Sequence, residues 1–241
     1  MAPTPQLQTV ILCGGYGTRM GSVTGTTPKP MVSVGGMPLL WHVMRCYADQ
    51  GHRRFVLCLG YLGEVIRAWF AAHPQPGWEV ILVDTGVDAS TAGRLAAAAP
   101  WLDRDASFFL TYGDGVADVD LAGLLAHHRE QGRLATVTAL RPQSRFGVLD
   151  LDQGVVSRFR EKPRLDQYVS GGFFVFEHRL LASLDPRRPL EDGTLAELAQ
   201  RGELAAWRHG GFWLSVDTPR DLAEINAMYD KEDTPWLAAS S

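Results

Sequence analysis

The chain has 241 residues, and 46% of them are hydrophobic, which is enough to build the core of a domain without metal or disulfide support. Its 23 basic and 27 acidic residues give a net charge of −4, which argues against nucleic acid or an anionic membrane as a partner. No apolar run approaches the roughly 18 residues of a membrane span. The three cysteines, Cys13, Cys46 and Cys58, lie in apolar segments without CxxC spacing, which is typical of a reducing cytoplasm.

Apolar runs of strand length alternate with helical patterns through the first 140 residues. The expected strands are 9–12, 55–60, 80–84, 108–112 and 135–140, and the expected helices are 39–50, 63–72, 91–99 and 121–131. This alternation is typical of βαβ units. It predicts an α/β fold with a Rossmann-like, mostly parallel (mixed) sheet and helices on both faces.

After residue 140 the pattern changes to shorter elements. Two expected strands, 146–151 and 155–160, flank a hairpin turn at 152–154, and another strand covers 169–176. Short elements follow at 195–200, 204–208, 212–216 and 220–229. We expect a small, mixed, β-rich C-terminal part within a single domain, 1–241, whose ends fray at about 1–5 and 234–241.

A glycine-rich segment follows the first strand. It reads Leu12-Cys13-Gly14-Gly15-Tyr16-Gly17-Thr18-Arg19, and Pro28-Lys29-Pro30 comes soon after. The first acidic residue is Asp49, so no carboxylate close in sequence neutralises Arg19 or Lys29. The dinucleotide pattern GxGxxG fails at Met20, and no Gly-Lys-Ser/Thr completes a Walker A loop. The segment therefore indicates another kind of polyphosphate cradle, and a tight turn with a surface Arg19 is the alternative.

Two aspartates follow apolar strands. Asp114 lies between glycines in Tyr112-Gly113-Asp114-Gly115, and Asp217 precedes Thr218-Pro219. Open α/β sheets bind ligands at the carboxyl ends of their strands, and aspartate is a suitable ligand for Mg²⁺ carried by a nucleotide. The alternatives are an Asp-Gly turn for Asp114 and a helix N-cap for Asp217.

A third group combines a lysine with glycines. Lys162 lies in Arg160-Glu161-Lys162-Pro163, and Ser170-Gly171-Gly172 precedes two phenylalanines. The lysine is suited to a second anionic substrate, and the glycines let a strand backbone approach it. A solvated loop and a β-bulge are the alternatives.

In their order along the chain, these motifs resemble those of the sugar-1-phosphate nucleotidylyltransferases, and most closely the cytidylyltransferases of glucose 1-phosphate. The resemblance covers roughly residues 9–236. It implies that the phosphate of a sugar 1-phosphate attacks the α-phosphorus of CTP, or of another nucleoside triphosphate, and that pyrophosphate leaves. It also implies Mg²⁺ as cofactor and a homo-oligomer as assembly.

The resemblance assigns a role to each matching position. Catalysis falls to Arg19, Lys29, Asp114 and Asp217, with Asp114 and Asp217 also as metal ligands. Nucleotide binding falls to Leu12, Gly14, Gly15, Gly17, Thr18, Arg19, Thr91, Arg94 and Gly113, where the loop containing Thr91 and Arg94 helps to select cytosine. Sugar-phosphate binding falls to Gly147, Glu161, Lys162, Ser170, Gly171 and Gly172.

The chain departs from the cytidylyltransferase pattern mainly on the sugar side. Ser170 stands where the pattern has asparagine, Ala92 replaces a glycine, and 186–194 matches poorly. The acceptor is therefore left open between glucose 1-phosphate and another phosphorylated sugar or polyol. A uridylyl-, thymidylyl- or guanylyltransferase, a nucleotide-sugar-dependent glycosyltransferase and a non-catalytic nucleotide-binding regulator are the alternative functions.

Overall fold

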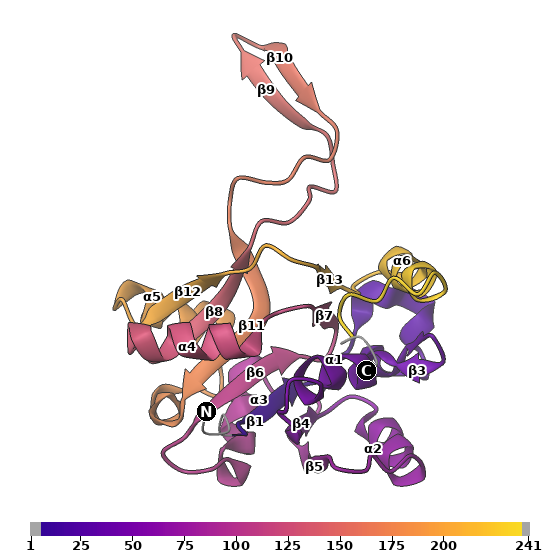
Figure 1. Cartoon of the computed structure of the whole chain (residues 1–241), viewed down its shortest axis with the longest axis vertical. Helices are drawn as coiled ribbons and strands as arrows, with labels where there is room; N and C mark the ends of the chain where they lie inside the picture. Colours follow the sequence, from indigo (N-terminus) through magenta and orange to yellow (C-terminus); the bar gives the residue numbers. More distant parts are fainter. Residues whose placement is uncertain (1–5, 238–241) are drawn as a thin grey trace.

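A central sheet of seven strands organises the computed structural model, which describes residues 6–237 (Figure 1). The strand order is β12-β8-β11-β6-β1-β4-β5. In chain order the strands are β1 (Gln8–Leu12), β4 (Arg54–Leu59), β5 (Glu79–Asp84), β6 (Ser107–Tyr112), β8 (Ala135–Leu140), β11 (Val169–Glu177) and β12 (Leu204–Arg208). The half containing β6, β1, β4 and β5 is parallel, and β11 pairs antiparallel with both β6 and β8. The predicted mixed, mostly parallel sheet is confirmed.

Helices cover both faces of this sheet. They are α1 (Leu39–Ala48), α2 (Gly63–Ala72), α3 (Thr91–Ala98), α4 (Leu121–Gln131), α5 (Ala196–Gln200) and α6 (Pro219–Tyr229). Successive side chains of a strand point to opposite faces, so Ile11 packs in one core with α1 and α4, while Val10 and Leu12 pack in another with α3. Both faces are buried, as expected for parallel strands that read as continuous apolar runs.

Short helical turns fill several connections. They are the 3₁₀ segments Thr18–Thr24, Lys29–Met31, Ala99–Trp101 and His178–Ser183, and a π-helical turn, Glu191–Leu195, that leads into α5. The expected element at 195–200 therefore begins earlier than predicted.

Two small sheets join short strands, of which only Trp213–Ser215 was expected, within the element at 212–216. β2 (Ser33–Val34) pairs with β3 (Met37–Pro38), and β7 (Gly115–Ala117) pairs antiparallel with β13 (Trp213–Ser215). The second pairing continues through the Val216 N–H, which donates to the Asp114 carbonyl oxygen at 2.9 Å. β7 was not predicted, because three residues carry too little pattern, and its pairing with β13 brings together two regions that are about a hundred residues apart.

A two-stranded hairpin projects away from the body of the molecule (Figure 1). It consists of β9 (Val148–Asp152) and β10 (Val155–Arg160), close to the predicted strands. Gln153 and Gly154 both have positive φ angles, 45° and 86°, which is the backbone of the hairpin turns that match strand twist.

The C-terminal segment is packed further than expected. Residues 1–5 and 238–241 lie outside the described residues, but the expected fraying of 234–237 is wrong. Trp236 is 2% exposed, contacts Phe212, and donates its Nε1–H to Nδ1 of His42 at 3.2 Å. Burial of a tryptophan outweighs the polar composition around it. Among the described residues, no helix has the length and apolar character needed to cross a bilayer.

Candidate active site

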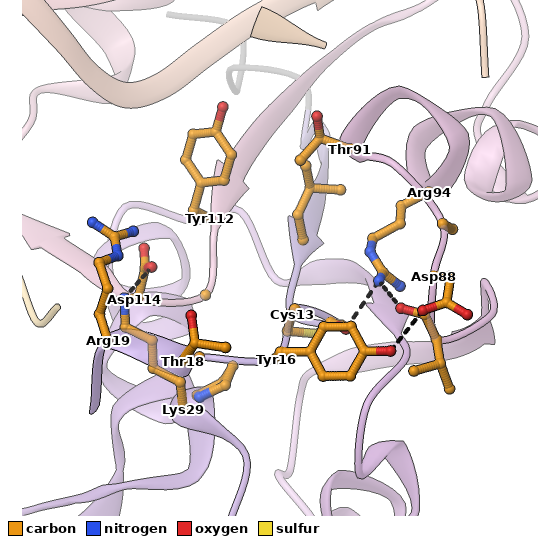
Figure 2. Close-up of a pocket in the computed structure, with 18 residues that line it drawn as sticks. Cys13, Tyr16, Thr18, Arg19, Lys29, Asp88, Thr91, Arg94, Tyr112 and Asp114 are labelled. Carbon is orange, nitrogen blue, oxygen red and sulfur yellow. Dashed lines mark hydrogen bonds and ion pairs between the residues drawn. The ribbon is translucent and has the colours of Figure 1, made fainter. Parts of the chain in front are cut away.

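A cavity of about 460 Å³ opens at the carboxyl ends of β1 and β6, and we call it the loop pocket (Figure 2). All nine residues expected to bind the nucleotide line it: Leu12, Gly14, Gly15, Gly17, Thr18, Arg19, Thr91, Arg94 and Gly113. Lys29 and Asp114 line it too. Residues from four separate stretches of sequence thus meet where an open α/β sheet places its ligand.

Backbone contacts hold the glycine-rich loop against the sheet. The Cys13 N–H donates to the Cys58 carbonyl, and the Tyr61 N–H donates to the Gly14 carbonyl, both near 3 Å. Gly113 lies so close to the loop that a Cβ there would be 3.1 Å from the Cβ of Cys13. The loop is therefore fixed at its start, while Gly15 has open space around it.

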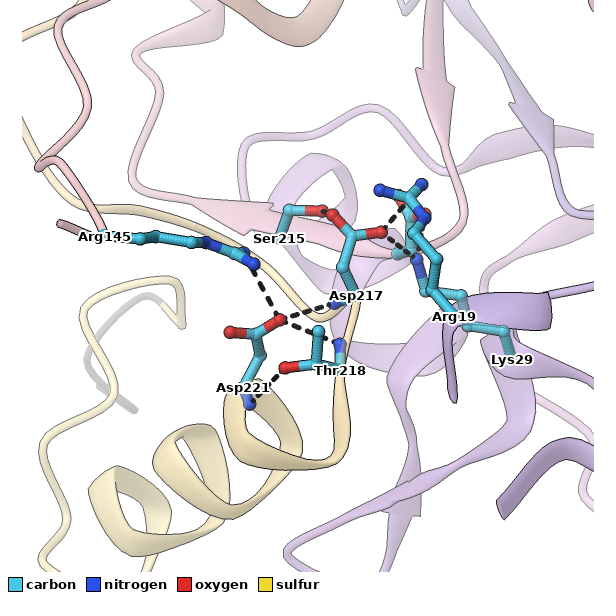
Figure 3. A network of polar contacts seen from close by, with 8 residues as sticks. Arg19, Lys29, Arg145, Ser215, Asp217, Thr218 and Asp221 are labelled. Atoms are coloured by element: carbon cyan, nitrogen blue, oxygen red, sulfur yellow. Dashed lines mark hydrogen bonds and ion pairs between the residues drawn. The ribbon is translucent and has the colours of Figure 1, made fainter. Parts of the chain in front are cut away.

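Lys29 joins the two aspartates that the sequence analysis singled out (Figure 3). Its Nζ lies 2.6 Å from Oδ2 of Asp114 and 2.7 Å from Oδ1 of Asp217, and its side chain is only 9% exposed. Arg19 places Nη2 3.0 Å from the same oxygen of Asp217, but its own side chain is 73% exposed. The buried ammonium is held by two carboxylates, while the guanidinium is free to turn toward a ligand.

The electrostatics of Asp217 follow from these contacts. Burial by itself would raise the pKa of Asp217, but the hydrogen bond and charge of Lys29 and the charge of Arg19 outweigh it, so the pKa lies below the usual range. Asp217 does not cap α6. Thr218 does, in a capping box with Asp221, so the carboxylate of Asp217 remains available to the site.

The two aspartates suit a divalent cation. Their oxygens already bracket one positive charge, the Lys29 ammonium, which shows that both carboxylates reach a common point. Among residues 6–237, no three His, Cys, Asp or Glu side chains gather. Two carboxylates with the remaining positions left to phosphate and water is the pattern that Mg²⁺ prefers.

The structure adds polar residues that the sequence interpretation missed. Tyr16 donates its hydroxyl to Oδ1 of Asp88 at 2.6 Å and packs on Tyr61, with ring centroids 5.1 Å apart. Tyr16 was visible within the glycine-rich loop, but its partner lies 72 residues away. This pair closes the loop pocket at the end away from Asp114 (Figure 2).

Glu191 forms a second such link. It accepts hydrogen bonds from the hydroxyls of Tyr112 and Thr91, the latter at 2.8 Å. Burial, followed by the charge and hydrogen bond of Glu191, raises the pKa of Tyr112 well above its ordinary value. Glu191 starts the π-helical turn, a feature that often marks functional sites, and it lies in the segment that departs from the family pattern.

Arg94 is placed differently from the expectation. It lines the loop pocket, but it is only 4% exposed and its two terminal nitrogens donate to oxygens of the protein itself. Burial lowers the pKa of Arg94, and the neighbouring thiols of Cys58 and Cys13 oppose that effect. In this structure its terminal nitrogens donate hydrogen bonds to backbone carbonyl oxygens around the pocket.

A larger cavity of about 910 Å³, which we call the outer pocket, lies on the other side of Asp217. Its lining includes Arg145, Lys162, Arg164 and Arg220, with Asp221 between them and the loop pocket. Asp221 accepts hydrogen bonds from the backbone N–H of Asp217 and Thr218 at 3.0 and 2.8 Å. The Asp221 carboxylate, which lines the outer pocket, thus holds the backbone of Asp217, whose side chain contacts Lys29 in the loop pocket.

The outer pocket gathers only part of the expected sugar-phosphate set. Of the six expected residues, Lys162 alone is among its lining residues. Gly147 and Glu161 lie together at the base of the hairpin, where a Cβ on Gly147 would meet Phe159 and Glu161. The two lie beside the cavity rather than in its wall.

The remaining three expected residues lie in β11. Pairing with β8 shifts register between Ser170 and Phe174, so this segment is bulged, and Gly172 has φ +76°. The Gly171 carbonyl accepts from Nε1 of Trp213 at 2.8 Å, and Gly172 lies against the ring of Tyr112. Packing against neighbouring side chains is therefore enough to require glycine at 171 and 172, independently of any contact with a sugar.

Comparison with known proteins agrees with this geometry. The family model described as "Nucleotidyl transferase" matches residues 8–232. A "Probable glucose-1-phosphate cytidylyltransferase" from Bacillus subtilis (strain 168) is 39% identical, with 95% of this chain and 99% of that protein covered. The "Glucose-1-phosphate cytidylyltransferase" of Salmonella typhi is 40% identical, with 95% and 98% covered. A mannose-1-phosphate guanylyltransferase catalytic subunit beta from Danio rerio is 31% identical, with 92% and 64% covered.

Solved structures show the same fold. HddC from Yersinia pseudotuberculosis superposes with a TM-score of 0.74 at 22% identity and covers 92% of this chain and 99% of that one. A putative glucose-1-phosphate thymidylyltransferase from Bacillus anthracis gives 0.70 at 20% identity, with 92% and 94% covered. From the family match and the extent of these alignments, we conclude that the chain belongs to the nucleotidyl transferase family.

Proposed function

We propose that this enzyme transfers a cytidylyl group from CTP to a sugar 1-phosphate, glucose 1-phosphate or a related phosphorylated sugar, with release of pyrophosphate and formation of a CDP-sugar. One observation carries the proposal: every residue expected to bind the nucleotide lines the loop pocket, together with Lys29 and Asp114, and Asp217 contacts Lys29. Relatives named for this activity are 39–40% identical over nearly the whole chain.

The reaction requires positioning and charge stabilisation rather than a covalent enzyme intermediate. The main chain of Gly14–Gly17 and the Thr18 hydroxyl surround the triphosphate, and the exposed Arg19 pairs with it. Lys29 lies deep enough to stabilise the charge that develops at the reacting phosphate.

A divalent cation completes the charge balance. Members of this family generally use one, and we infer Mg²⁺ held by Asp114 and Asp217, where it would neutralise phosphate charge as a Lewis acid. Lys29 lies within 2.7 Å of both carboxylates, so its ammonium would lie beside a cation held by them and beside the phosphate that the cation binds.

The acceptor would enter from the outer pocket. Lys162 is suited to its phosphate, and Gly147, Glu161, Ser170, Gly171 and Gly172 remain our prediction for the sugar contacts. Ser170 replaces the asparagine of the family pattern, so an acceptor other than glucose 1-phosphate fits this half of the site equally well.

The base and the acceptor are tested together. Pyrophosphate release is measured with CTP, UTP, dTTP and GTP in turn, with Mg²⁺ and a panel of sugar and polyol phosphates. We expect CTP with a sugar 1-phosphate to give the highest kcat/KM. A preference for GTP with mannose 1-phosphate, the substrate in the name of the Danio rerio relative, would overturn the base assignment. Without pyrophosphate release from any triphosphate, cytidylyl transfer would be excluded.

We also propose that the enzyme is a homo-oligomer assembled through the projecting hairpin. Directly paired residues share a face, so Leu149 with Phe159 and Leu151 with Val156 form one apolar face. These four side chains are 47–65% exposed. The opposite face carries Asp150, which accepts from Nη2 of Arg160 at 2.9 Å. An isolated two-stranded hairpin is marginal in water, so a second copy packing on this face would stabilise it.

Two variants on opposite faces test the assembly. The double variant Leu151→Ser, Phe159→Ser removes the apolar face, whereas Val155→Ser alters a residue of similar exposure, 69%, on the other face. Light scattering coupled to size exclusion should show that only the double variant dissociates. A monomeric wild type would overturn the proposal. The buried thiols of Cys13, Cys46 and Cys58 favour a cytoplasmic location, which cell fractionation tests.

A further inference from the structure

Arg94 binds more of the main chain than any other side chain of the loop pocket's described residues. From α3 it donates to five oxygens: Leu59 O (3.2 Å), Thr85 Oγ1 (2.7 Å), Gly86 O (2.8 Å), Gly14 O (2.9 Å) and Val87 O (2.9 Å). None of these five partners is a carboxylate. Burying a guanidinium without a counter-charge is costly unless its donors are satisfied. The presence of arginine at this buried position therefore indicates a specific role for its five hydrogen bonds.

The acceptors belong to the ends of three adjacent strands. Gly14 follows β1, Leu59 ends β4, and Gly86 and Val87 follow β5, and these strands are neighbours in the sheet. One side chain therefore ties the loop that surrounds the phosphates to the wall on the other side of the loop pocket. Figure 2 shows Arg94 between that wall and Cys13, on the side of the pocket away from Lys29.

Two glycines make room for the guanidinium. A Cβ on Gly14 or on Gly60 would overlap Nη1 of Arg94, whereas a Cβ on Gly15 would meet no atom within 4 Å. Gly60 is not among the residues that line the loop pocket. Arg94 and the Gly60 backbone together thus require a glycine at position 14, in a loop that we also propose to bind the triphosphate.

Arg94 also fixes the direction of two peptide groups in the wall. The N–H of a trans peptide points opposite to its carbonyl. Because the Gly86 and Val87 carbonyls accept from Arg94, the N–H groups of Val87 and Asp88 point away from it. Cytosine presents acceptors at O2 and N3, whereas uracil has an N–H at position 3, so fixed backbone donors would distinguish the two bases.

We propose that Arg94 is a positioning residue for base selection: it fixes the main chain at 86–88 relative to Gly14 and discriminates cytosine from uracil without donating to the base. The proposal rests on the proposed cytidylyl transfer. It also explains why a residue expected to contact the base has its terminal nitrogens bonded to the protein.

The test compares CTP with UTP in wild type, Arg94→Met and Arg94→Lys. For Arg94→Met we expect KM for CTP to rise about 10-fold, kcat to stay within about 3-fold, and the CTP/UTP ratio of kcat/KM to fall about 10-fold. Arg94→Lys should restore little of the ratio, because one ammonium cannot reach acceptors on three strands. Arg53→Met, which removes an arginine bonded to the Ala48 carbonyl away from the pocket, should leave the ratio unchanged.

Gly60→Ala gives a second approach from outside the pocket. A Cβ there would lie 2.4 Å from Nη1 of Arg94 and 2.5 Å from the Gly14 carbonyl oxygen. It should therefore separate the guanidinium from Gly14 and lower the CTP/UTP ratio, and the effects of Gly60→Ala and Arg94→Met should be less than additive. Calorimetric titration of each folded variant with CTP and with UTP, without acceptor, gives the same comparison independent of turnover.

Equal losses for CTP and UTP, or a fall in kcat with an unchanged KM, would overturn the positioning role. If the wild type itself shows no preference for CTP, the proposed function fails instead. If it prefers CTP and the variants do so equally, only the role of Arg94 fails.

Discussion

The two cavities hold their charged side chains in different ways. In the loop pocket, Lys29 is 9% exposed and lies within 2.7 Å of both aspartates. In the outer pocket, Lys162 is 44% exposed and its nearest carboxylate, Glu161, is 3.9 Å away, while Arg145 is 63% exposed. The charged side chains of the loop pocket are thus held by close contacts, while those of the outer pocket are more exposed and more loosely paired. Substitutions should therefore have larger and more specific effects in the loop pocket than in the outer pocket.

The largest effect is expected at Asp114. Asp114→Asn removes the charge of a carboxylate that we propose as a metal ligand, and should lower the rate of pyrophosphate release by about 10³-fold or more. Asp152→Asn, an exposed change in the hairpin, is the control and should leave the rate unchanged. Unchanged turnover of Asp114→Asn would contradict the catalytic role of that residue.

Lys29 is expected to come next. Lys29→Ala should lower kcat by about 100-fold, since it removes charge stabilisation at the reacting phosphate. It also leaves Asp114 and Asp217 facing each other with only the exposed Arg19 beside Asp217, which should lower the free energy of unfolding by about 2 kcal/mol. Lys231→Ala, outside both cavities, should change neither quantity. If Lys29→Ala loses no more activity than a variant of the outer pocket, the proposed difference between the two pockets would be wrong.

In the outer pocket the effect should be smaller and confined to the acceptor. Lys162→Ala should raise KM for the sugar 1-phosphate by about 10-fold, while KM for CTP stays within about twofold. Arg158→Ala in the hairpin is the matched control. If KM for CTP rises in parallel, the two halves are coupled more tightly than their contacts indicate.

The smallest expected effect is the contribution of Asp217 to the pH dependence of the free energy of unfolding. Because the pKa of Asp217 is lowered in the folded state, its ionised form stabilises the protein above the ordinary aspartate pKa, and this contribution disappears as the pH falls through the lowered value. Chemical unfolding of wild type and Asp217→Asn should differ by about 1 kcal/mol at pH 7, and the gap should close below about pH 4. A gap that stays constant down to pH 3 would show that the carboxylate charge contributes nothing.

The sheet and most of its helices could be predicted because each carries a long apolar pattern. Helix 63–72 and helix 121–131 match the structure at both ends, as does the strand 135–140. The β7–β13 pairing could not be predicted, since three-residue strands have no usable periodicity and their partners are distant in sequence.

The same distinction applies to the site. Motif order along the chain identified the residues of the loop pocket, but not the contacts between them. Nothing local to Gly14 indicates that it makes room for Arg94, and nothing near Tyr16 indicates Asp88. Such contacts depend on how three strand ends meet, which a linear pattern does not contain.

The three cysteines offer a way to observe the loop pocket open. All are buried, and burial raises the pKa of Cys46 and of Cys58 to about 12 and that of Cys13 well above its ordinary value. The thiolate is the form that attacks alkylating reagents, so the thiols of the folded enzyme should react with them very slowly. Cys13 begins the glycine-rich loop and lines the loop pocket. Its labelling rate, followed by mass spectrometry with and without CTP, would measure how often this loop opens. The labelling rate of Cys46 is the internal reference for global unfolding.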